Sequence, residues 1–190
     1  MAIAERTGCT VLNALYGNRL DDAAPWRQDE CALENLELAA RTAQDVATVV
    51  IEPLNSIESP RYPLVRTRHA LDLIDRVGED TGHRLGLLYD AYHMQRMEGN
   101  LIDTLRRHAP SLTHVQIADA PGRGAPGTGE IAYGRVLDAL HETGYRGNIG
   151  LEYKSAGPDH DDFSWLRPEG RGRLQSAAHA PVSRHLTPSE

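Results

Sequence analysis

The sequence predicts an α/β fold in which the strands of a parallel sheet alternate with helices. Five short runs rich in Val, Ile and Leu have the length of strands. Four stretches between them carry apolar residues at helical spacing, and glycine or proline punctuates most of the boundaries. Such alternation folds as right-handed βαβ units. Two architectures stay open at this point: an open doubly wound sheet, or part of a barrel.

The strand candidates share apolar, mostly β-branched residues followed by a polar side chain. They are TVLNALYG (10–17), TVVIEPLN (48–55), RLGLLYD (84–90), LTHVQIAD (112–119) and NIGLEYK (148–154). The second run is almost wholly apolar until Glu52, which is typical of a strand buried on both faces.

The helix candidates lie in the four intervals between these strands. They are expected around 28–47, over about 70–77 with an end at Gly78, around 98–108 and around 133–143. Gly144 follows the last of them at the position where a left-handed glycine commonly ends a helix.

The composition bounds the class of protein. The 190 residues carry 20 Lys+Arg and 27 Asp+Glu, a formal net charge of −7, which argues against nucleic acid as a partner. No apolar run approaches the roughly 20 residues of a membrane span, so no membrane partner is expected. Cys9 and Cys31 are too few for a disulfide framework, and we expect them to be buried small residues in a cytoplasmic protein. One domain is expected over 1–167, with 168–190 a disordered polar tail.

Polar side chains follow four successive strand candidates at the point where each apolar run ends. They are Glu52, Asp90, Gln116 and Glu152. Because the carboxyl ends of parallel strands open onto one face, we expect these side chains to converge there. Three close carboxylates repel one another unless a cation lies among them, and oxygen ligands suit Mg²⁺ or Mn²⁺.

Two simpler interpretations stand beside this one. A single acidic residue at a strand end is most often a helix cap or a solvated charge, but four in succession are hard to obtain by chance. The segment from Gly122 to Gly127 also spells G-x-G-x-x-G. We reject dinucleotide binding, because Pro126 lies inside the segment and the helical period begins only near Tyr133. The segment is expected to be a long active-site loop.

The residues around these strand ends resemble the hydroxypyruvate isomerase family of xylose-isomerase-like TIM barrels. The resemblance covers about residues 8–166, and YHMQ-x-MEG and PG-x-GEI are its most specific motifs. It is carried by IEPLN (51–55), YDAYHMQRMEG (89–99), HVQIADAPGRGAPGTGEIAY (114–133) and GLEYKSAG (150–157). The fold class it implies is α/β, a partial (β/α)8 TIM barrel of about five parallel strands with intervening helices.

The resemblance implies a Mg²⁺- or Mn²⁺-assisted isomerisation of hydroxypyruvate to tartronate semialdehyde through an enediolate. Glu52, Asp90, Gln116 and Glu152 match the four metal ligands of the family, and Glu52 and Glu152 also match its proton-transferring carboxylates. In related sugar epimerases a histidine tends to occupy the place of Gln116, so glutamine favours the hydroxypyruvate branch.

Three further residues are candidates for binding a small keto-acid or sugar-like substrate. His93 either hydrogen-bonds substrate oxygens or has a plain loop role. Arg123 either pairs with the substrate carboxylate or is a solvated arginine. Glu58 either contacts substrate or is a charge at a helix start.

The chain departs from the family at its start, because relatives carry about three further strand–helix units. A (β/α)8 barrel usually needs about 250 residues. Five strands cannot close a barrel and leave two unpaired edges. Three outcomes stay open: pairing with a second copy as a homo-oligomer, a true start upstream of Met1, or an inactive remnant. An isomerase or epimerase of another keto acid or ketose, such as a 2-oxo-tetronate, also remains open.

Overall fold

A computed structural model describes residues 1–157, 161 and 163–166 of the chain. The chain divides into two compact units, Met1–Lys154 and Ser155–Glu190. The first unit holds every helix and strand of the described residues. In the second, Asp161 and Phe163–Leu166 form turns, with the Ser164 amide donating to the Asp161 carbonyl. The tail expected over 168–190 lies outside the described residues.

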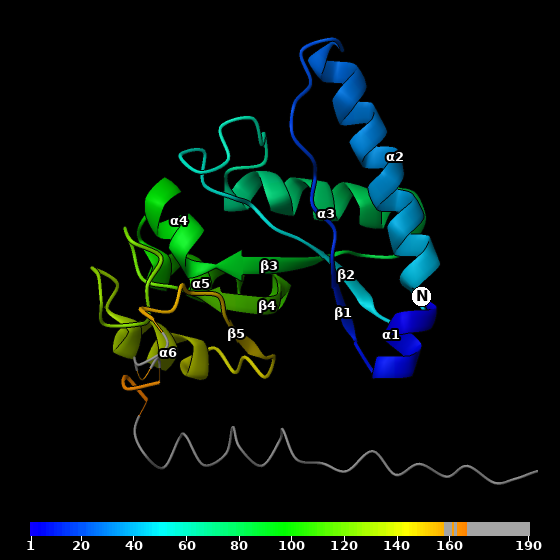
Figure 1. The fold of residues 1–190 in the computed structure, drawn as a ribbon. Helices are drawn as coiled ribbons and strands as arrows, with labels where there is room; N and C mark the ends of the chain where they lie inside the picture. The colour runs from blue at the N-terminus through cyan, green and yellow to red at the C-terminus, as the bar shows by residue number, and fades with distance from the viewer. Residues whose placement is uncertain (158–160, 162, 167–190) are drawn as a thin grey trace, which may run out of the picture. The chain divides into compact units, whose positions relative to one another are not determined.

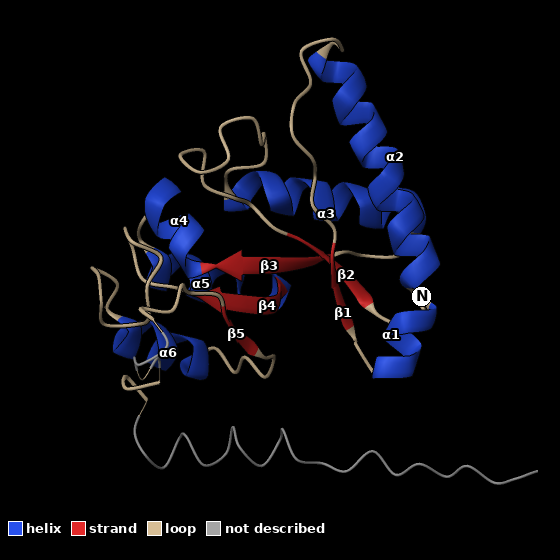
Figure 2. Cartoon of the chain, in the orientation of Figure 1, coloured by secondary structure: helices blue, strands red, loops and turns tan. Residues whose placement is uncertain are grey.

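The first unit is built on a five-stranded parallel sheet (Figures 1 and 2). Its strands are β1 (Val11–Asn13), β2 (Thr48–Ile51), β3 (Gly86–Asp90), β4 (Leu112–Ile117) and β5 (Ile149–Leu151). Each pairs with the next in chain order, β1-β2-β3-β4-β5. A doubly wound sheet reverses its strand order at a switch point, whereas a barrel does not. The order therefore confirms the partial barrel over the open sheet.

Helices connect the strands as the sequence predicts, with two additions. The α-helices are α1 (Ala2–Thr7), α2 (Pro25–Ala43), α3 (Thr67–Thr81), α4 (Ala91–Met97), α5 (Leu101–His108) and α6 (Tyr133–Glu142). A short 3-10 turn, η1 (Ala109–Ser111), precedes β4. Helices α2 and α3 pack against each other, as do α5 and α6, and α3 also packs on β3 (Figure 1).

Helix α3 continues past the predicted end at Gly78. Its buried face, which includes Ala70, Ile74 and Val77, keeps the helical period up to that glycine. The helix ends instead at Gly82, whose φ of 75° is the left-handed conformation that glycine adopts without strain. A single glycine inside a helix costs only about 1 kcal/mol, so packing outweighs it.

Helix α4 has no amphipathic signal in the sequence, because its first four residues, 91–94, are all buried. It follows β3 directly, and the Asp90 carboxylate accepts the Tyr92 amide at 2.7 Å as its N-terminal cap. Gly99 and Asn100 then take positive φ values of 62° and 53° and separate α4 from α5. The single helix expected around 98–108 is thus α5 alone.

Burial is highest at the middle of the sheet and falls toward its edges. Every residue of β3 is buried, whereas none of β1 or β5 is. Cys9 and Cys31 are exposed, so the expectation that they are buried is wrong. Cys9 lies in the connection before an edge strand, and Cys31 lies on a part of α2 that faces a surface pocket.

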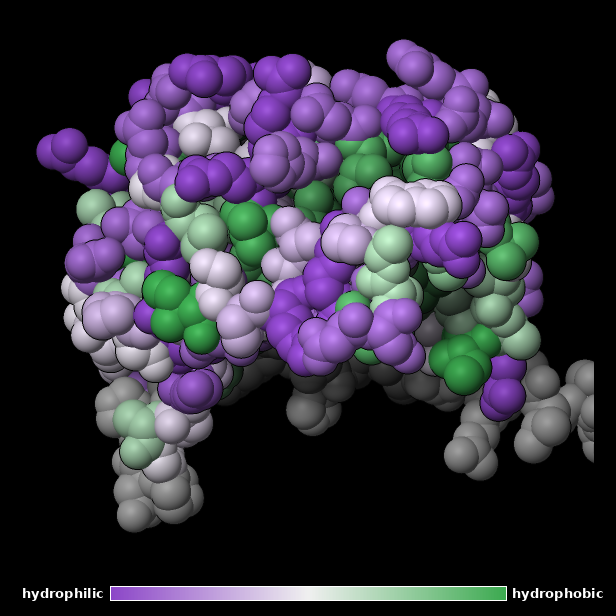
Figure 3. Space-filling view, turned by 90° about the horizontal axis from the view of Figure 1, so that it is seen from above, coloured by the Kyte–Doolittle hydropathy of each residue, from purple (hydrophilic) through white to green (hydrophobic). Residues whose placement is uncertain are grey.

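Hydrophilic residues dominate the face seen in Figure 3, where apolar residues form separate green patches. The exposed large apolar side chains include Leu15, Leu20, Trp26, Leu38 and Ile57. Among the described residues, no helix has the length and apolar character needed to cross a bilayer.

Candidate active site

Acidic side chains from the ends of three strands and a histidine from one helix meet at the carboxyl end of the sheet. Side chains alternate along a strand, so Glu52 lies on the same side as Val50, and Asp90 on the same side as Leu88. Single ligand atoms of Glu52, Asp90, His93 and Glu152 all lie within 4.8 Å of one another. The structure thus brings together the three carboxylates that the sequence places at strand ends, and adds the imidazole.

Asp90 is the most deeply buried member of the cluster, with no exposed surface. Its Oδ1 caps α4, while no donor among the described residues reaches Oδ2. Burial raises the pKa of Asp90 to about 8, with further contributions from Glu152 and Glu52. A buried carboxylate with one unsatisfied oxygen is costly unless a proton or a cation neutralises it.

Glu52 follows β2 directly and is 5% exposed. Asn13, at the end of the neighbouring strand β1, donates its side-chain amide to Glu52 Oε2 at 2.7 Å. Burial raises the pKa of Glu52 to about 7, the Asn13 hydrogen bond opposes the rise, and Glu152 adds to it. The sequence analysis did not single out Asn13, because it lies inside an apolar run and belongs to no motif.

Gln116 lies on β4 beside Asp90, its register partner on β3. Its Oε1 is buried and has no hydrogen-bond partner among the described residues. A Cβ on the neighbouring Gly150 would lie 3.2 Å from Gln116 Cγ, so glycine leaves the amide its room. Among the described residues, Gln116 Oε1 and Asp90 Oδ2 are buried oxygens with unused lone pairs, and oxygen is the type of donor that a hard divalent cation prefers.

His93 is held from behind by Asn55. The Asn55 backbone amide donates to His93 Nδ1 at 3.0 Å, and its side-chain nitrogen lies 2.7 Å from the same atom. Burial lowers the pKa of His93 to about 4, which leaves the ring neutral near pH 7. Because Nδ1 accepts, the proton is on Nε2, 3.8 Å from Asp90 Oδ2. This tautomer makes His93 a hydrogen-bond donor toward the cluster.

Arg123 and Glu58 lie together at the open side of the cluster. The Arg123 guanidinium is 2.9 Å from Glu152 Oε2 and 3.4 Å from Glu58 Oε2. It also stacks on the Tyr92 ring, 5.1 Å from the ring centre. Glu58 belongs to a turn in which Asn55 Oδ1 accepts its amide, so the alternative of a helix-start charge is wrong. Both residues are therefore placed beside the carboxylates.

Asp119, a buried acidic residue outside the predicted site, holds the loop that carries Arg123. Asp119 is 1% exposed, and its carboxylate accepts backbone amides from the loop that follows β4. In the sequence it is the last residue of the run LTHVQIAD, and only its position before a glycine-rich stretch hints at a turn role.

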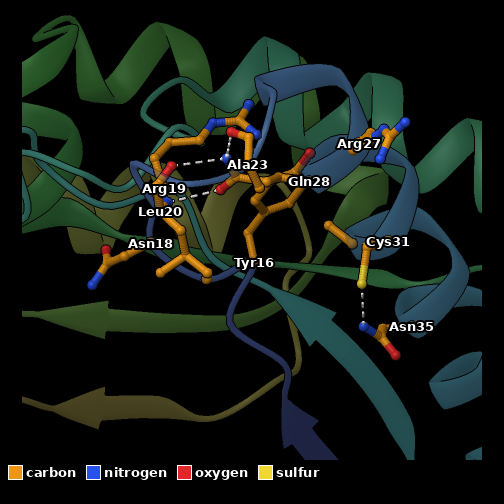
Figure 4. A pocket seen from close by; sticks show the side chains of 11 residues that line it. Tyr16, Asn18, Arg19, Leu20, Ala23, Arg27, Gln28, Cys31 and Asn35 are labelled. Atoms are coloured by element: carbon orange, nitrogen blue, oxygen red, sulfur yellow. Dashed lines mark hydrogen bonds between the residues drawn. The ribbon is translucent and has the colours of Figure 1, made fainter.

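One pocket adjoins the site and another lies apart from it. The first, of about 390 Å³, is lined by Gln116 and by inner-face residues that include Val50 and Leu88, a region that side chains of further strands fill in a closed barrel. The other, of about 340 Å³, lies between α2 and the loop after β1 (Figure 4). There Gln28 bonds both the Leu20 amide and the Leu20 carbonyl, and none of the clustered residues lines it.

The sequence model described as "xylose isomerase-like TIM barrel" matches residues 1–171. The chain belongs to this family. The cluster of acidic residues and histidine agrees with the divalent-metal use that is common among xylose isomerase-like proteins.

Sequence relatives of this xylose isomerase-like chain are named as isomerases. A putative hydroxypyruvate isomerase of Streptomyces coelicolor is 49% identical over 86% of the chain and 60% of its own length. Hydroxypyruvate isomerase of Escherichia coli is 37% identical over 87% of the chain and 63% of its own length. A 2-oxo-tetronate isomerase of Cupriavidus necator is 35% identical over 72% of the chain and 52% of its own length.

Among solved structures, a Brucella melitensis protein described as an AP endonuclease of family 2 superposes with a TM-score of 0.75. The two sequences are 31% identical, and the match covers 83% of this chain and 60% of the Brucella chain. The present chain thus spans about 60% of the length of the Streptomyces, Escherichia and Brucella proteins.

Proposed function

We propose that the chain carries the active site of a hydroxypyruvate isomerase that interconverts hydroxypyruvate and tartronate semialdehyde in the cytoplasm. The observation that carries the proposal is the convergence of Glu52, Asp90, His93 and Glu152 within 4.8 Å, with buried oxygens of Asp90 and Gln116 left unsatisfied. The names of two relatives that align over most of this chain supply the substrate.

The proposed metal ligands are Glu52, Asp90, Gln116 and Glu152, and the proposed cation is Mg²⁺ or Mn²⁺. All four side chains offer oxygen, the donor that these hard cations prefer. Bound there, such a cation would polarise the carbonyl and hydroxyl oxygens of a substrate and stabilise negative charge on them. His93 is left out of this set, because its Nε2 carries the proton and Nδ1 is occupied by Asn55.

Glu52 and Glu152 are the proposed proton-transferring residues. The isomerisation removes a proton from C3 of hydroxypyruvate and returns one to C2, while the hydroxyl proton passes from the C3 oxygen to the C2 oxygen. The two carboxylates come from β2 and from the end of β5, with β3 and β4 between them, so they approach a bound substrate from different sides. One removes the proton and the other returns it.

His93 and Arg123 are proposed to bind and orient the substrate, with Glu58 supporting Arg123. His93 donates from Nε2 to a substrate oxygen, as its fixed tautomer allows. Arg123 offers a forked guanidinium to the substrate carboxylate, and Glu58 balances its charge in the absence of substrate.

The test is Mn²⁺ binding followed by turnover. We expect calorimetry to show one Mn²⁺ site in the chain, and an assay of hydroxypyruvate conversion to depend on that metal. Absence of Mn²⁺ binding at micromolar concentrations contradicts the site. Metal binding without conversion of hydroxypyruvate contradicts the activity of the chain as it stands.

A second candidate is isomerisation of a 2-oxo-tetronate, favoured by the name of one relative. The proton chemistry at Glu52 and Glu152 is the same, so only the preference between the substrates separates the candidates. A higher kcat/KM for 2-oxo-tetronate than for hydroxypyruvate selects this alternative.

A further inference from the structure

Asp119 is an almost fully buried carboxylate that serves no part of the carboxylate cluster. It is 1% exposed, and each of its oxygens accepts two backbone amides. Oδ1 accepts from Ala120 at 2.9 Å and Ile131 at 3.0 Å, and Oδ2 accepts from Gly127 at 2.8 Å and Gly129 at 2.9 Å. Four backbone amides that donate to one carboxylate stabilise its negative charge without a cation.

These four bonds fasten both ends and the middle of the segment 120–131. The Asp119 backbone joins in, because its amide donates to the Gly124 carbonyl at 2.7 Å. Arg123 lies inside the turn that this bond closes, at a φ of 57° that non-glycine residues rarely adopt. Surrounding bonds must hold such a residue in place, and the Lys154 amide adds one to the Arg123 carbonyl at 2.8 Å.

The glycines of the segment fit closely around the Asp119 carboxylate. A Cβ on Gly129 would lie 2.0 Å from the Ala120 carbonyl oxygen and 2.7 Å from Asp119 Oδ1. Gly127 has open space around it but a φ of 92°, which a side chain would strain. Both glycines present their amides to the same oxygen, Asp119 Oδ2.

The position of the Arg123 guanidinium therefore depends on Asp119 through the backbone of the loop. The Asp119 carboxylate binds loop amides, whereas the Arg123 side chain pairs with Glu152. The guanidinium lies over the Tyr92 ring and 2.9 Å from Glu152. A substrate carboxylate bound by Arg123 is thus set next to a proposed proton-transferring residue. Displacing the loop would move this binding group, while Glu52, Asp90 and His93 are carried by other elements.

We propose that Asp119 is a positioning residue that fixes Arg123 and thereby makes the site selective for substrates with a carboxylate. The proposal rests on the proposed function, since it takes Arg123 as the group that binds that carboxylate. Asp119 acts through the loop and touches neither substrate nor metal.

The first experiment compares two probes on the Mn²⁺-loaded full chain. Hydroxypyruvate carries a carboxylate, and dihydroxyacetone has the same ketone and hydroxymethyl group with a second hydroxymethyl group in its place. We expect Asp119→Asn to weaken hydroxypyruvate binding about 10-fold or more in calorimetry, because the amide nitrogen cannot accept from the loop. Binding of dihydroxyacetone and of Mn²⁺ should change less than about threefold. Equal losses for both probes overturn the proposal.

The second experiment is a double-mutant cycle with Arg123→Gln. If Asp119 acts through Arg123, the double variant binds hydroxypyruvate no more weakly than Arg123→Gln alone. Additive losses overturn the proposal, because they show that Asp119 acts by another route. Asp103→Asn is the matched control, since it removes an exposed carboxylate that pairs with Arg107 on α5.

Hydrogen exchange of the Gly127 and Gly129 amides tests the loop clamp independently of any substrate. We expect both to exchange at least 10-fold faster in Asp119→Asn, and unchanged exchange overturns the clamp. If Asp119→Asn fails to fold, Gly127→Ala strains the same loop and should show the same selective loss, with Gly144→Ala as control at a φ of 76°. A chain without substitutions that binds no hydroxypyruvate contradicts the proposed function, while the exchange result still decides the clamp.

Discussion

Asp90 and Glu152 are both acids at the carboxyl end of the sheet, yet the molecule holds them in different ways. Asp90 ends the central strand β3, has no exposed surface, and is fixed by capping α4. Glu152 follows the edge strand β5, its side chain is 42% exposed, and Arg123 holds it at 2.9 Å. Burial thus sets the electrostatics of the first, and an ion pair orients the second.

The difference shows that the buried centre and the exposed edge of the sheet hold their acidic residues by different means. The central strands form a packed frame in which a charge is expensive, so a cation at Asp90 relieves a large penalty. The edge strand is open to water, and its acid needs a guanidinium from a loop to keep one orientation. Changes at the centre should therefore alter stability and metal affinity, and changes at the edge should alter turnover and substrate binding.

The largest effect is expected from removing the proposed proton-transferring carboxylates. Glu152→Gln and Glu52→Gln should each lower the rate of hydroxypyruvate conversion about 10²–10⁴-fold, because an amide cannot take up or return the proton. A coupled assay of tartronate semialdehyde formation measures this. Glu142→Gln, on the exposed ion pair with Arg106, is the control. Rates within a few-fold of the unsubstituted chain contradict both roles.

Core substitutions should separate the centre of the sheet from its edge. Leu87→Ala, at a position with no exposed surface on β3, should lower the free energy of unfolding by about 2–5 kcal/mol. Leu151→Ala on β5 removes a side chain from a residue that is 39% exposed, and should cost less than about 1 kcal/mol. Urea unfolding followed by circular dichroism measures both. Equal losses would mean that the edge is packed by a partner or a second copy.

Asp90→Asn should change stability and metal binding in opposite directions. The variant keeps an oxygen to cap α4 and removes the buried charge that Asp90 carries above its raised pKa of about 8, so the thermal midpoint of the metal-free chain at pH 9 should rise by about 2–4 °C. Mn²⁺ affinity should fall at least about 100-fold, because a ligand charge is lost. Calorimetry measures both quantities. Unchanged Mn²⁺ affinity would exclude Asp90 from the ligand set.

The stability of the metal-free chain should fall as the pH rises from 6.5 to 8.5. Burial raises the pKa values of Glu52 and Asp90 to about 7 and 8, above their ordinary values of 4.5 and 3.8. Their stabilising contribution is therefore complete below the ordinary values and is lost as the pH passes the raised ones. The pKa of His93 is lowered from 6.5 to about 4, so its titration affects stability only below about pH 6.5 and does not contribute between pH 6.5 and 8.5.

Thermal unfolding across this pH range, with and without Mn²⁺, measures the effect. We expect a decline of a few degrees without the metal and a larger stabilisation by Mn²⁺ at the higher pH. A midpoint that rises between pH 6.5 and 8.5 in the metal-free chain would contradict the burial of these charges.

Periodicity in the sequence was sufficient for the order of strands and helices, because each apolar run and each amphipathic stretch reports its own burial. It was insufficient for α4, whose first residues are buried on all sides and so show no period. It also placed the end of α3 at Gly78, since the left-handed turn at Gly82 depends on how the chain enters β3. The exposure of Cys31 likewise follows from a pocket between α2 and a loop.

The candidate site divides in a similar way. Strand ends in the sequence predicted Glu52, Asp90, Gln116 and Glu152 as candidates, because parallel strands bring their carboxyl ends to one face. Asn13 and Asp119 were missed because each contacts its partners only through the fold. Their roles rest on a hydrogen bond to Glu52 from 39 residues away and on amides of a loop that has no regular structure.

By itself the sequence determined which chemical groups stand at the ends of the strands and that the strands run parallel, since both follow from local patterns along the chain. Only the tertiary structure decided the sheet order, the neutral tautomer of His93, and the hold of Asp119 on the loop of Arg123. The reason is physical: these features depend on contacts between residues far apart in the chain, whose distances and burial no local pattern specifies.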